Sequence, residues 1–434
     1  MVEIKTICIV GLGYVGLPTA VAFAKKGYKV HGADVNEKTV QKLNSGVSTI
    51  PEILPNNVIK EHVDSGNLSV TTDTPKAVKE SDAILITVPT PVNDSKNPEL
   101  RFVRSAAESV AKGLGKNKLV VLESTVYPGA TEEIVQPILE KTGLKAGKDF
   151  GLAYCPERYN PGDKKHTLSK MARVVGAIND EWLKTASHMY AKITDVGVHE
   201  VSNIKTAEAA KVIENTQRDI NIALVNELAL IFDRIGIDTR EVLDAAATKW
   251  NFHHYTPGPG CGGHCIPVDP YYLVFKAKEL GYEAKIITAG RKINDYMAHH
   301  TVVLAARALN ERKKPLSSSK IAVLGIAYKG NIADARESPA RHIIEELLDM
   351  KADVYAYDPL VPKEEIESFS AKPATLQNAL KDADCIIIHT DHEEFKNLDL
   401  SKASELVRTK TIVDTRGVID PREARKHGFL LARI

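Results

Sequence analysis

Short apolar runs, separated by glycine-rich or polar stretches, open the chain and indicate alternating strands and helices. The run "TICIV" (6–10) is continuous and largely β-branched, as expected for a strand buried on both faces of a parallel sheet. A glycine turn "GLGYVG" (11–16), a helical stretch "LPTAVAFAKKG" (17–27) and a second apolar run "YKVHGAD" (28–34) follow it. Together they predict a strand–turn–helix–strand unit, which the apolar runs at 83–88 and 119–124 extend into a larger sheet.

The same order of elements recurs in the last part of the chain. "KIAVLG" (320–325) leads into "GIAYKG" (325–330), a helical stretch "ARHIIEELLDM" (340–350) and "ADVYAYD" (352–358). The runs "DCIIIHT" (384–390) and "KTIVDTR" (410–416) match those at 83–88 and 119–124. In the glycine turn, Gly11, Gly13 and Gly16 correspond to Gly325, Ala327 and Gly330. Because the second glycine lets the backbone approach a pyrophosphate, we expect the second unit to suit a dinucleotide less well and to hold a different ligand.

Residues 203–235, between the two units, contain neither glycine nor proline, and Gly236 follows them. A helix of this length far exceeds the usual length of about 11 residues, and a glycine commonly ends one. We therefore expect an α/β protein in which two Rossmann-like domains are joined by a long central helix that also offers a dimer surface. The predicted domains are residues 1–200, 201–312 and 318–434, with "NERKKPLSSSK" (310–320) as the linker into the last.

Composition narrows the class of protein. A chain of 434 residues with 43% hydrophobic and 26% charged residues is typical of a soluble protein with two or three domains. A formal net charge of +1 favours neither nucleic acid nor an acidic membrane surface as a partner. Five scattered cysteines predict a reducing compartment, and no stretch is both long and apolar enough to span a bilayer. We therefore expect a cytoplasmic protein.

The first glycine turn has the full context of a dinucleotide-binding fingerprint. It follows a strand, opens a helix and is followed by Asp34 at the end of the next strand. The pyrophosphate is expected at the helix N-terminus, and Asp34 on the adenosine ribose, which favours NAD over NADP. Ligands of such sheets lie beyond the carboxyl ends of the strands, which places Thr90 and Thr125 beside the cofactor. The alternative is a purely structural glycine turn.

The stretch "GCGGHCIPVDPY" (260–271) concentrates chemically reactive residues in a glycine-rich loop. Cys261, His264 and Cys265 could ligate a metal, but no second ligand cluster stands at zinc-finger spacing, so no metal is predicted. The two cysteines do not have C-x-x-C spacing, which disfavours a redox pair. A buried structural cysteine is the default for a lone thiol. Against it, the glycine- and proline-rich loop is expected to expose Cys265, with Asp269 four residues on.

Three polar residues of the long helix share one of its faces. Glu208, Lys211 and Asn215 stand at i, i+3 and i+7. Their spacing alone favours a surface Glu–Lys pair beside a solvated asparagine. Their chemistry fits another function: a cysteine nucleophile that oxidises an aldehyde needs an ammonium or amide group for the oxyanion and a carboxylate to activate water.

At these residues the chain resembles the UDP-sugar 6-dehydrogenase family, which includes UDP-glucose and UDP-N-acetylhexosamine dehydrogenases. The resemblance covers essentially the whole length and rests on "GLGYVGLP", "VPTP", "ESTVYPG", "CPERYNPGDKKH", "AEAAKVIENTQRDINIALVNE", "PGPGCGGHCIPVDPYYL" and "GIAYKGNIADARESP". It implies an NAD domain, a helical linker that builds a homodimer, and a C-terminal domain that closes over the UDP moiety. The implied reaction oxidises the C6 alcohol of the sugar to a carboxylate and reduces two NAD⁺.

The resemblance also implies roles for individual residues. Cys265 would be the nucleophile, Lys211 and Asn215 would stabilise oxyanion charge, and Asp269 would orient or activate water, with Glu157 and Thr125 completing the polar network. The implied cofactor-binding residues are Gly11, Gly13, Tyr14, Val15, Gly16, Asp34, Thr90, Thr125 and Arg336. The implied substrate-binding residues are Glu157, Arg158, Lys211, Asn215, Tyr255, Gly258, Gly260, Lys329 and Arg416.

Two segments, "CPERYNPGDKKH" and "KWNF", resemble the N-acetylhexosamine branch, which favours UDP-N-acetylglucosamine as substrate and places UDP-N-acetylmannosamine next. UDP-glucose enzymes commonly bring an arginine from the partner subunit near the position of Lys249, and a lysine lacks the planar guanidinium, so the role of Lys249 is open. The competing hypotheses are a UDP-glucose 6-dehydrogenase, a two-electron hydroxyacid dehydrogenase that uses Lys211 and Asn215 without covalent catalysis, and a nucleotide sensor without turnover.

Overall fold

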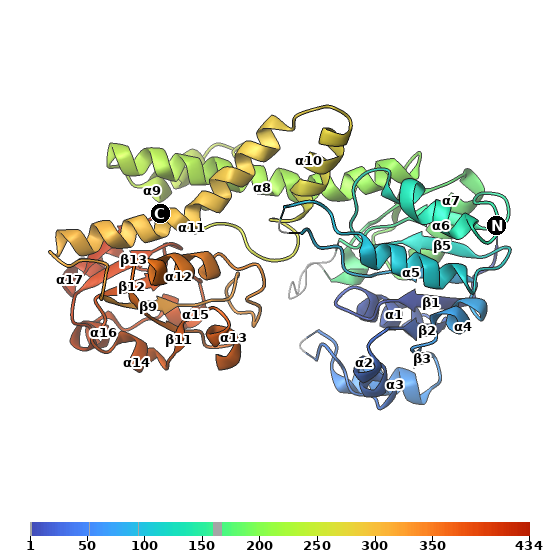
Figure 1. Ribbon diagram of the computed structural model, residues 1–434, viewed down its shortest axis with the longest axis horizontal. Helices are drawn as coiled ribbons and strands as arrows, with labels where there is room; N and C mark the ends of the chain where they lie inside the picture. The colour runs from blue at the N-terminus through green and yellow to red at the C-terminus, as the bar shows by residue number, and fades with distance from the viewer. Residues whose placement is uncertain (1, 52, 94, 159–166) are drawn as a thin grey trace. The chain divides into compact units, whose positions relative to one another are not determined.

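The computed structural model describes residues 2–51, 53–93, 95–158 and 167–434 (Figure 1). The chain divides into two compact units. The N-terminal unit comprises Met1–Glu214 and Tyr271–Tyr282, and the C-terminal unit comprises Asn215–Pro270 and Glu283–Ile434. The three domains predicted from the sequence stay a prediction. Among the described residues, no helix is both long and apolar enough to cross a membrane.

The N-terminal unit is built on an eight-stranded sheet of order β3-β2-β1-β4-β5-β6-β7-β8. Neighbouring strands run parallel except β6 and β7, which pair antiparallel. The strands are β1 (Thr6–Val10), β2 (Lys29–Ala33), β3 (Leu68–Thr71), β4 (Ala83–Ile86), β5 (Leu119–Leu122), β6 (Gly151–Tyr154), β7 (Arg173–Ala177) and β8 (Val198–Glu200). The helices of this unit are α1 (Gly16–Lys25), α2 (Glu37–Asn44), α3 (Asn56–Asp64), α4 (Thr74–Lys79), α5 (Arg101–Ala111), α6 (Gln136–Glu140) and α7 (Asp180–Ala191).

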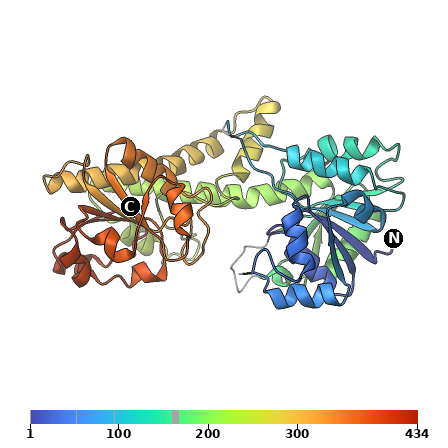
Figure 2. The same ribbon diagram turned by 60° about the horizontal axis from the view of Figure 1, so that its bottom comes forward.

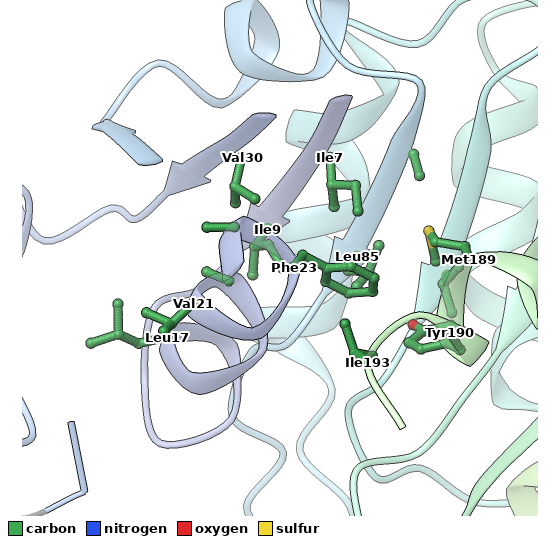
Figure 3. Close-up of a cluster of buried hydrophobic side chains, with 14 of the residues drawn as sticks. Ile7, Ile9, Leu17, Val21, Phe23, Val30, Leu85, Met189, Tyr190 and Ile193 are labelled. Atoms are coloured by element: carbon green, nitrogen blue, oxygen red, sulfur yellow. The ribbon is translucent and has the colours of Figure 1, made fainter. Parts of the chain in front are cut away.

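The core of the N-terminal unit explains why the strand β1 is apolar at every position. Ile7 and Ile9 belong to one buried cluster with residues of α1 and α7, and Figure 3 labels Phe23 and Tyr190 among its members. Cys8, which alternates with them along the strand, is also buried, so helices and loops cover both faces of the sheet. This burial on both faces confirms the expectation from the continuous run of apolar residues.

The C-terminal unit repeats the strand order of the first six strands. Its parallel sheet has the order β11-β10-β9-β12-β13-β14. The strands are β9 (Lys320–Leu324), β10 (Asp353–Tyr357), β11 (Lys372–Pro373), β12 (Cys385–Ile388), β13 (Thr411–Asp414) and β14 (Leu430–Arg433). The helices are α9 (Thr239–Ala246), α11 (Lys285–Glu311), α12 (Ala340–Asp349), α13 (Lys363–Glu367), α14 (Leu376–Leu380), α15 (Glu393–Lys396), α16 (Leu400–Leu406) and α17 (Pro421–Lys426). The predicted internal repeat is confirmed.

Two helices have residues in both units. The helix α8 (Ile204–Ile235) is one uninterrupted helix of 32 residues, drawn in green in Figure 2. It ends where expected, because Gly236 has a φ of 79° and its N–H donates to the carbonyl of Phe232. The shorter helix α10 (Asp269–Glu279) begins directly after the Cys265 loop. The fold class predicted from the sequence is confirmed: two parallel-sheet units and a long central helix.

Candidate active site

The glycine turn between β1 and α1 is built for close contact between backbone segments. Gly11 has a φ of 96°, and a Cβ atom on Gly16 would lie 1.9 Å from the carbonyl oxygen of Gly11. The Thr87 hydroxyl, at the end of β4, donates to that same carbonyl over 2.7 Å. By contrast, a Cβ atom on Gly13 would meet nothing within 4 Å. The turn is therefore compact on the protein side and leaves room at Gly13 for a diphosphate to approach the backbone.

The two Rossmann-like units differ at the acidic residue that follows their second strand. In the N-terminal unit, Asp34 accepts one backbone bond on each oxygen, from Leu12 (2.8 Å) and from Asn36 (2.9 Å), and is half-buried. This carboxylate retains lone pairs for the hydroxyl groups of a ribose.

Its counterpart Asp358 is saturated by its own chain. It accepts from the N–H groups of Ile326, Ala327, Leu360 and Val361 over 2.8–3.0 Å, and its Oδ2 lies 3.1 Å from Nε2 of His392. These hydrogen bonds hold the pKa of Asp358 well below its usual range despite burial. The C-terminal unit therefore has Ala327 in its turn and lacks the partly open carboxylate that Asp34 provides in the N-terminal unit.

Glu157 belongs to a buried charged cluster in the N-terminal unit. Its carboxylate lies 2.8 Å from Nη1 of Arg173, the first residue of β7, and both side chains are less than a tenth exposed. The backbone N–H of Arg158 donates to the other Glu157 oxygen over 2.7 Å. Nearby, the Tyr190 hydroxyl donates to Glu123 over 2.6 Å, and the Arg173 guanidinium lies 5.7 Å from the centroid of the Tyr190 ring. Arg173 therefore holds in place the carboxylate of Glu157, which the sequence predicts to belong to the site.

Glu123 makes this cluster sensitive to pH. Burial raises its pKa from the ordinary value of 4.5 to about 7, although Arg173 opposes the shift. Between pH 4.5 and pH 7, Glu123 is therefore protonated in the folded state and ionised in the unfolded state. The free energy of unfolding of the wild type falls as the pH rises through this range, because the folded state binds the additional proton. Glutamine cannot titrate, so we expect Glu123→Gln to gain up to about 3 kcal/mol relative to wild type between pH 4.5 and pH 8.

The measurement for Glu123→Gln is urea unfolding of both proteins at a series of pH values. The exposed Glu108 on α5 provides the control variant Glu108→Gln, for which the difference from wild type should not change with pH. A difference between Glu123→Gln and wild type that is equally independent of pH would contradict the assignment.

On α8, the structure corrects the interpretation of Glu208 as part of a surface pair. Glu208 is fully buried and accepts from the N–H of Thr131 (2.9 Å), from its hydroxyl (2.6 Å) and from the N–H of Gly129 (2.5 Å). Burial raises its pKa to about 7. Glu208 therefore anchors α8 to the loop after β5, which contains Thr125. Lys211, one turn further along, is also mostly buried, so neither residue is a solvated surface group.

In the C-terminal unit, three predicted catalytic residues are linked. The Asn215 amide donates to the Asp269 carboxylate over 2.6 Å, and the Asp269 N–H donates to the carbonyl of Cys265 over 2.8 Å. Asp269 is buried and begins α10, whereas Cys265 is exposed, as the glycine-rich loop predicts. Cys261 differs from Cys265, since burial raises the pKa of its thiol to about 12. Of the two thiols, Cys265 is the one open to a reactant.

The loop that contains Cys265 packs on the C-terminal sheet domain through its glycines. A Cβ atom on Gly258 would lie 2.9 Å from Nη1 of Arg416, and one on Gly263 would lie 3.0 Å from the ring of Tyr328. Arg416 itself is anchored by its Nε, which donates to the carbonyl of His389 over 2.8 Å. Next to Tyr328, Lys329 is exposed, and Arg336 forms two hydrogen bonds to Asp334 over 2.7–2.8 Å.

The predicted residues are thus divided between the two units. The N-terminal unit holds Gly11, Gly13, Tyr14, Val15, Gly16, Asp34, Thr90, Thr125, Glu157, Arg158 and Lys211, and the C-terminal unit holds Asn215, Tyr255, Gly258, Gly260, Cys265, Asp269, Lys329, Arg336 and Arg416. Residues 159–166 of the "CPERYNPGDKKH" motif lie outside the described residues. Sequence reasoning missed Arg173 and Glu123. Among the described residues, no group of three or more His, Cys, Asp or Glu side chains is placed to hold a metal ion.

Comparison with known proteins decides the family. Models of the UDP-glucose/GDP-mannose dehydrogenase family match residues 5–194 as the NAD binding domain, 205–296 as the central domain and 322–421 as the UDP binding domain. The chain belongs to this family. It is therefore an oxidoreductase with NAD as its cofactor, as the glycine turn and Asp34 indicate. The predicted family and cofactor are confirmed, whereas the roles of single residues stay predictions.

Individual relatives of this dehydrogenase cover nearly its whole length. Protein CapL of Staphylococcus aureus is 41% identical over 96% of the chain and 97% of its own length. The UDP-N-acetyl-D-glucosamine 6-dehydrogenase of Pseudomonas aeruginosa is also 41% identical, over 95% of the chain and 97% of its own length. Among solved structures, the UDP-D-ManNAc dehydrogenase of Pyrococcus horikoshii superposes with a TM-score of 0.91 at 36% identity, covering 99% of both chains.

Proposed function

We propose that this protein oxidises a UDP-N-acetylhexosamine at C6 to the uronic acid in two successive steps, with Cys265 as the nucleophile. The observation that carries the proposal is the linked set in the C-terminal unit. An exposed thiol stands one helical turn from a buried carboxylate, Asp269, which accepts a hydrogen bond from the Asn215 amide. A two-electron hydroxyacid dehydrogenase does not require a cysteine nucleophile linked to a carboxylate. A nucleotide sensor without turnover does not require an exposed cysteine at this position.

The residues suit each step of the proposed reaction. When bound, NAD⁺ would supply the hydride acceptor for both oxidations at C6. The Cys265 thiolate adds to the aldehyde carbon, and the carbonyl oxygen becomes the oxyanion of a thiohemiacetal. Loss of hydride from this oxyanion gives a thioester. Lys211 and Asn215 supply the ammonium and amide that stabilise the oxyanion. Water then cleaves the thioester, releasing the carboxylate and the thiol, with Asp269 as the group that orients or activates it.

The proposed sugar is N-acetylglucosamine. Support comes from the "CPERYNPGDKKH" and "KWNF" segments and from the relative in Pseudomonas aeruginosa, which is named for that sugar. The solved structure from Pyrococcus horikoshii is of a UDP-D-ManNAc dehydrogenase, which makes N-acetylmannosamine the second candidate.

The deciding assay follows NADH with UDP-GlcNAc, UDP-ManNAc, UDP-GalNAc and UDP-glucose side by side. We expect the highest kcat/KM with UDP-GlcNAc and two NADH for each sugar consumed, because the alcohol and the thiohemiacetal each lose one hydride. One NADH for each sugar would overturn the four-electron mechanism. A higher kcat/KM with UDP-ManNAc would overturn only the choice of sugar.

We also propose that the protein is a cytoplasmic homodimer formed through α8. The five cysteines are scattered along the chain, which favours a reducing compartment. Ile213, Leu224, Ile231 and Ile235 are each 44–63% exposed, and their spacing places them on one stripe of the helix. A stripe of exposed large aliphatic residues is typical of a helix that packs on another helix.

Leu224→Glu should therefore convert the dimer to a monomer, because a charge at a helix–helix contact loses its hydration without gaining a partner. Analytical ultracentrifugation measures the change. Arg218→Glu, which introduces the same side chain at an exposed position off the stripe, should leave the dimer intact. Equal masses for wild type and Leu224→Glu would contradict the proposed interface.

A further inference from the structure

A buried polar network joins α8 to α11 beneath the glycine loop of the C-terminal unit. At its far end, Nη1 of Arg291 donates to Asp219 over 2.5 Å, and Arg291 also pairs with Asp295. Asn294, one turn from Arg291, donates its amide to both the carboxylate (2.7 Å) and the carbonyl (2.9 Å) of Asp219. Asp219, Arg291 and Asn294 are each at most 3% exposed. None of these residues belongs to the catalytic set proposed above.

The Asp219–Arg291 ion pair determines which end of each asparagine amide faces which neighbour. Asp219 accepts two hydrogen bonds at its carboxylate, so the Asn294 amide must turn its nitrogen toward Asp219 and its oxygen away. That oxygen accepts from the Asn226 amide nitrogen over 2.8 Å. The Asn226 oxygen is thereby left facing the loop, where it accepts from the backbone N–H of Gly258 over 2.9 Å. Asn226 is fully buried, so water does not substitute for either bond.

The loop segment 258–261 is held closely at this point. A Cβ atom on Gly260 would lie 2.9 Å from the carbonyl oxygen of Asn294, so Asn294 contacts the loop directly as well as through Asn226. On another side, Gly258 packs against the guanidinium of Arg416. The loop is therefore fixed between the helix pair α8–α11 and a residue proposed to bind the substrate.

We infer that Asn226, oriented by Asn294 and the buried Asp219–Arg291 ion pair, is a positioning residue for sugar-nucleotide binding. It holds segment 258–261 in the conformation that presents Gly258, Gly260 and Arg416 to the UDP-sugar. The inference rests on the proposed function for the identity of the ligand, but the loop conformation can be tested without turnover.

The kinetic test compares two asparagines of the same helix. Asn226→Ala removes the acceptor for Gly258, whereas Asn221→Ala makes the same change at a half-buried position outside the network. We expect the KM for UDP-GlcNAc to rise about tenfold in Asn226→Ala, since a buried donor loses its partner. The change in kcat and in NAD affinity should stay within about twofold, because segment 258–261 and the glycine turn belong to different units.

The second readout is the reactivity of Cys261, which reports on the loop even if the proposed function is wrong. Cys261 is a half-buried thiol whose raised pKa keeps it protonated and slow to react. In a Cys265→Ser background it is the only thiol of the loop. Iodoacetamide should then alkylate Cys261 at least about tenfold faster in Asn226→Ala than in Asn221→Ala, because a released loop exposes the sulfur to solvent.

A third variant keeps the test valid should Asn226→Ala fold poorly. In Asn226→Asp, a protonated carboxyl can still accept from Gly258 and donate to the Asn294 oxygen, whereas a carboxylate can only accept. Burial and the nearby Asp219 favour the protonated form. We therefore expect the Asn226→Asp variant to bind UDP nearly as tightly as wild type at pH 5.5 and at least about tenfold more weakly at pH 8.5. Calorimetry measures both affinities. The nearby charged residues Arg291, Asp295 and Arg416 are the same in both proteins.

The outcomes separate the inference from the function. If wild type oxidises none of the four UDP-sugars, the proposed function fails. The rate of Cys261 alkylation and the affinity for UDP then still test whether Asn226 positions the loop. If folded Asn226→Ala matches Asn221→Ala in KM and in alkylation rate, or if Asn226→Asp shows no pH-dependent weakening beyond wild type, the network is only structural and the inference is overturned.

Discussion

Replacing Cys265 by serine is expected to lower uronic acid formation by roughly 10⁴-fold, because a serine hydroxyl is a far weaker nucleophile toward the aldehyde than a cysteine thiolate. The structure exposes this thiol and links its backbone to Asp269. The measurement is NADH formation with UDP-GlcNAc at saturating NAD⁺, with chromatography to identify whether alcohol, aldehyde or acid accumulates.

The neighbouring thiol provides the matched control. Cys261→Ser makes the same chemical change four residues away in the same loop, at a half-buried sulfur with a raised pKa, and should keep activity within about tenfold of wild type. Equal losses in both variants would indicate that the loop, and not the Cys265 nucleophile, is responsible.

A companion variant traps the covalent intermediate. In Asp269→Asn, water cleavage should become the slowest step, so intact-protein mass spectrometry should detect a thioester at Cys265 after one rapid burst of NADH. Cys265→Ser/Asp269→Asn should show no such adduct. The absence of an adduct in Asp269→Asn, with activity retained, would contradict both assigned roles.

Arg173→Met is expected to destabilise the N-terminal unit by about 3–5 kcal/mol, since removing one partner of a buried ion pair leaves the other charge uncompensated. Both Arg173 and Glu157 are buried, and Glu123 and Tyr190 lie in the same cluster. Urea unfolding followed by the fluorescence of Trp182, a buried residue of α7, measures the loss in this unit.

Two further variants test this explanation. Arg101→Met breaks an exposed ion pair with Glu99 (3.0 Å) in the same unit and should cost at most about 1 kcal/mol. Combining Arg173→Met with Glu157→Gln should restore part of the stability, because no charge is then left unpaired. A loss below about 1 kcal/mol for Arg173→Met would contradict the importance of the pair.

The features that depend on residues close together in the sequence could be predicted. The strand β1, the glycine turn and Asp34 are close together in the chain, and each follows from the type of residue that its backbone position requires. The end of α8 follows in the same way from Gly236. The exposure of Cys265 follows from the glycine- and proline-rich loop around it.

The features that could not be predicted depend on partners distant in sequence. Arg173 opens an ordinary apolar strand, and no pattern pairs it with Glu157. Glu208 looks like one half of an i, i+3 surface pair, but its true partners lie 77–79 residues away at Thr131 and Gly129. The asparagines Asn226 and Asn294 are 68 residues apart, and each alone resembles a solvated helix position.

The saturation of Asp358 limits what a single substitution can change in the C-terminal unit. Four backbone N–H groups and His392 occupy the carboxylate that, in the matching half, is half-buried and retains lone pairs. Replacing Ala327 by glycine would therefore not be enough to give the C-terminal half an open carboxylate like Asp34. Several backbone groups and a histidine together make the difference, so no single substitution in the turn converts one half into the other.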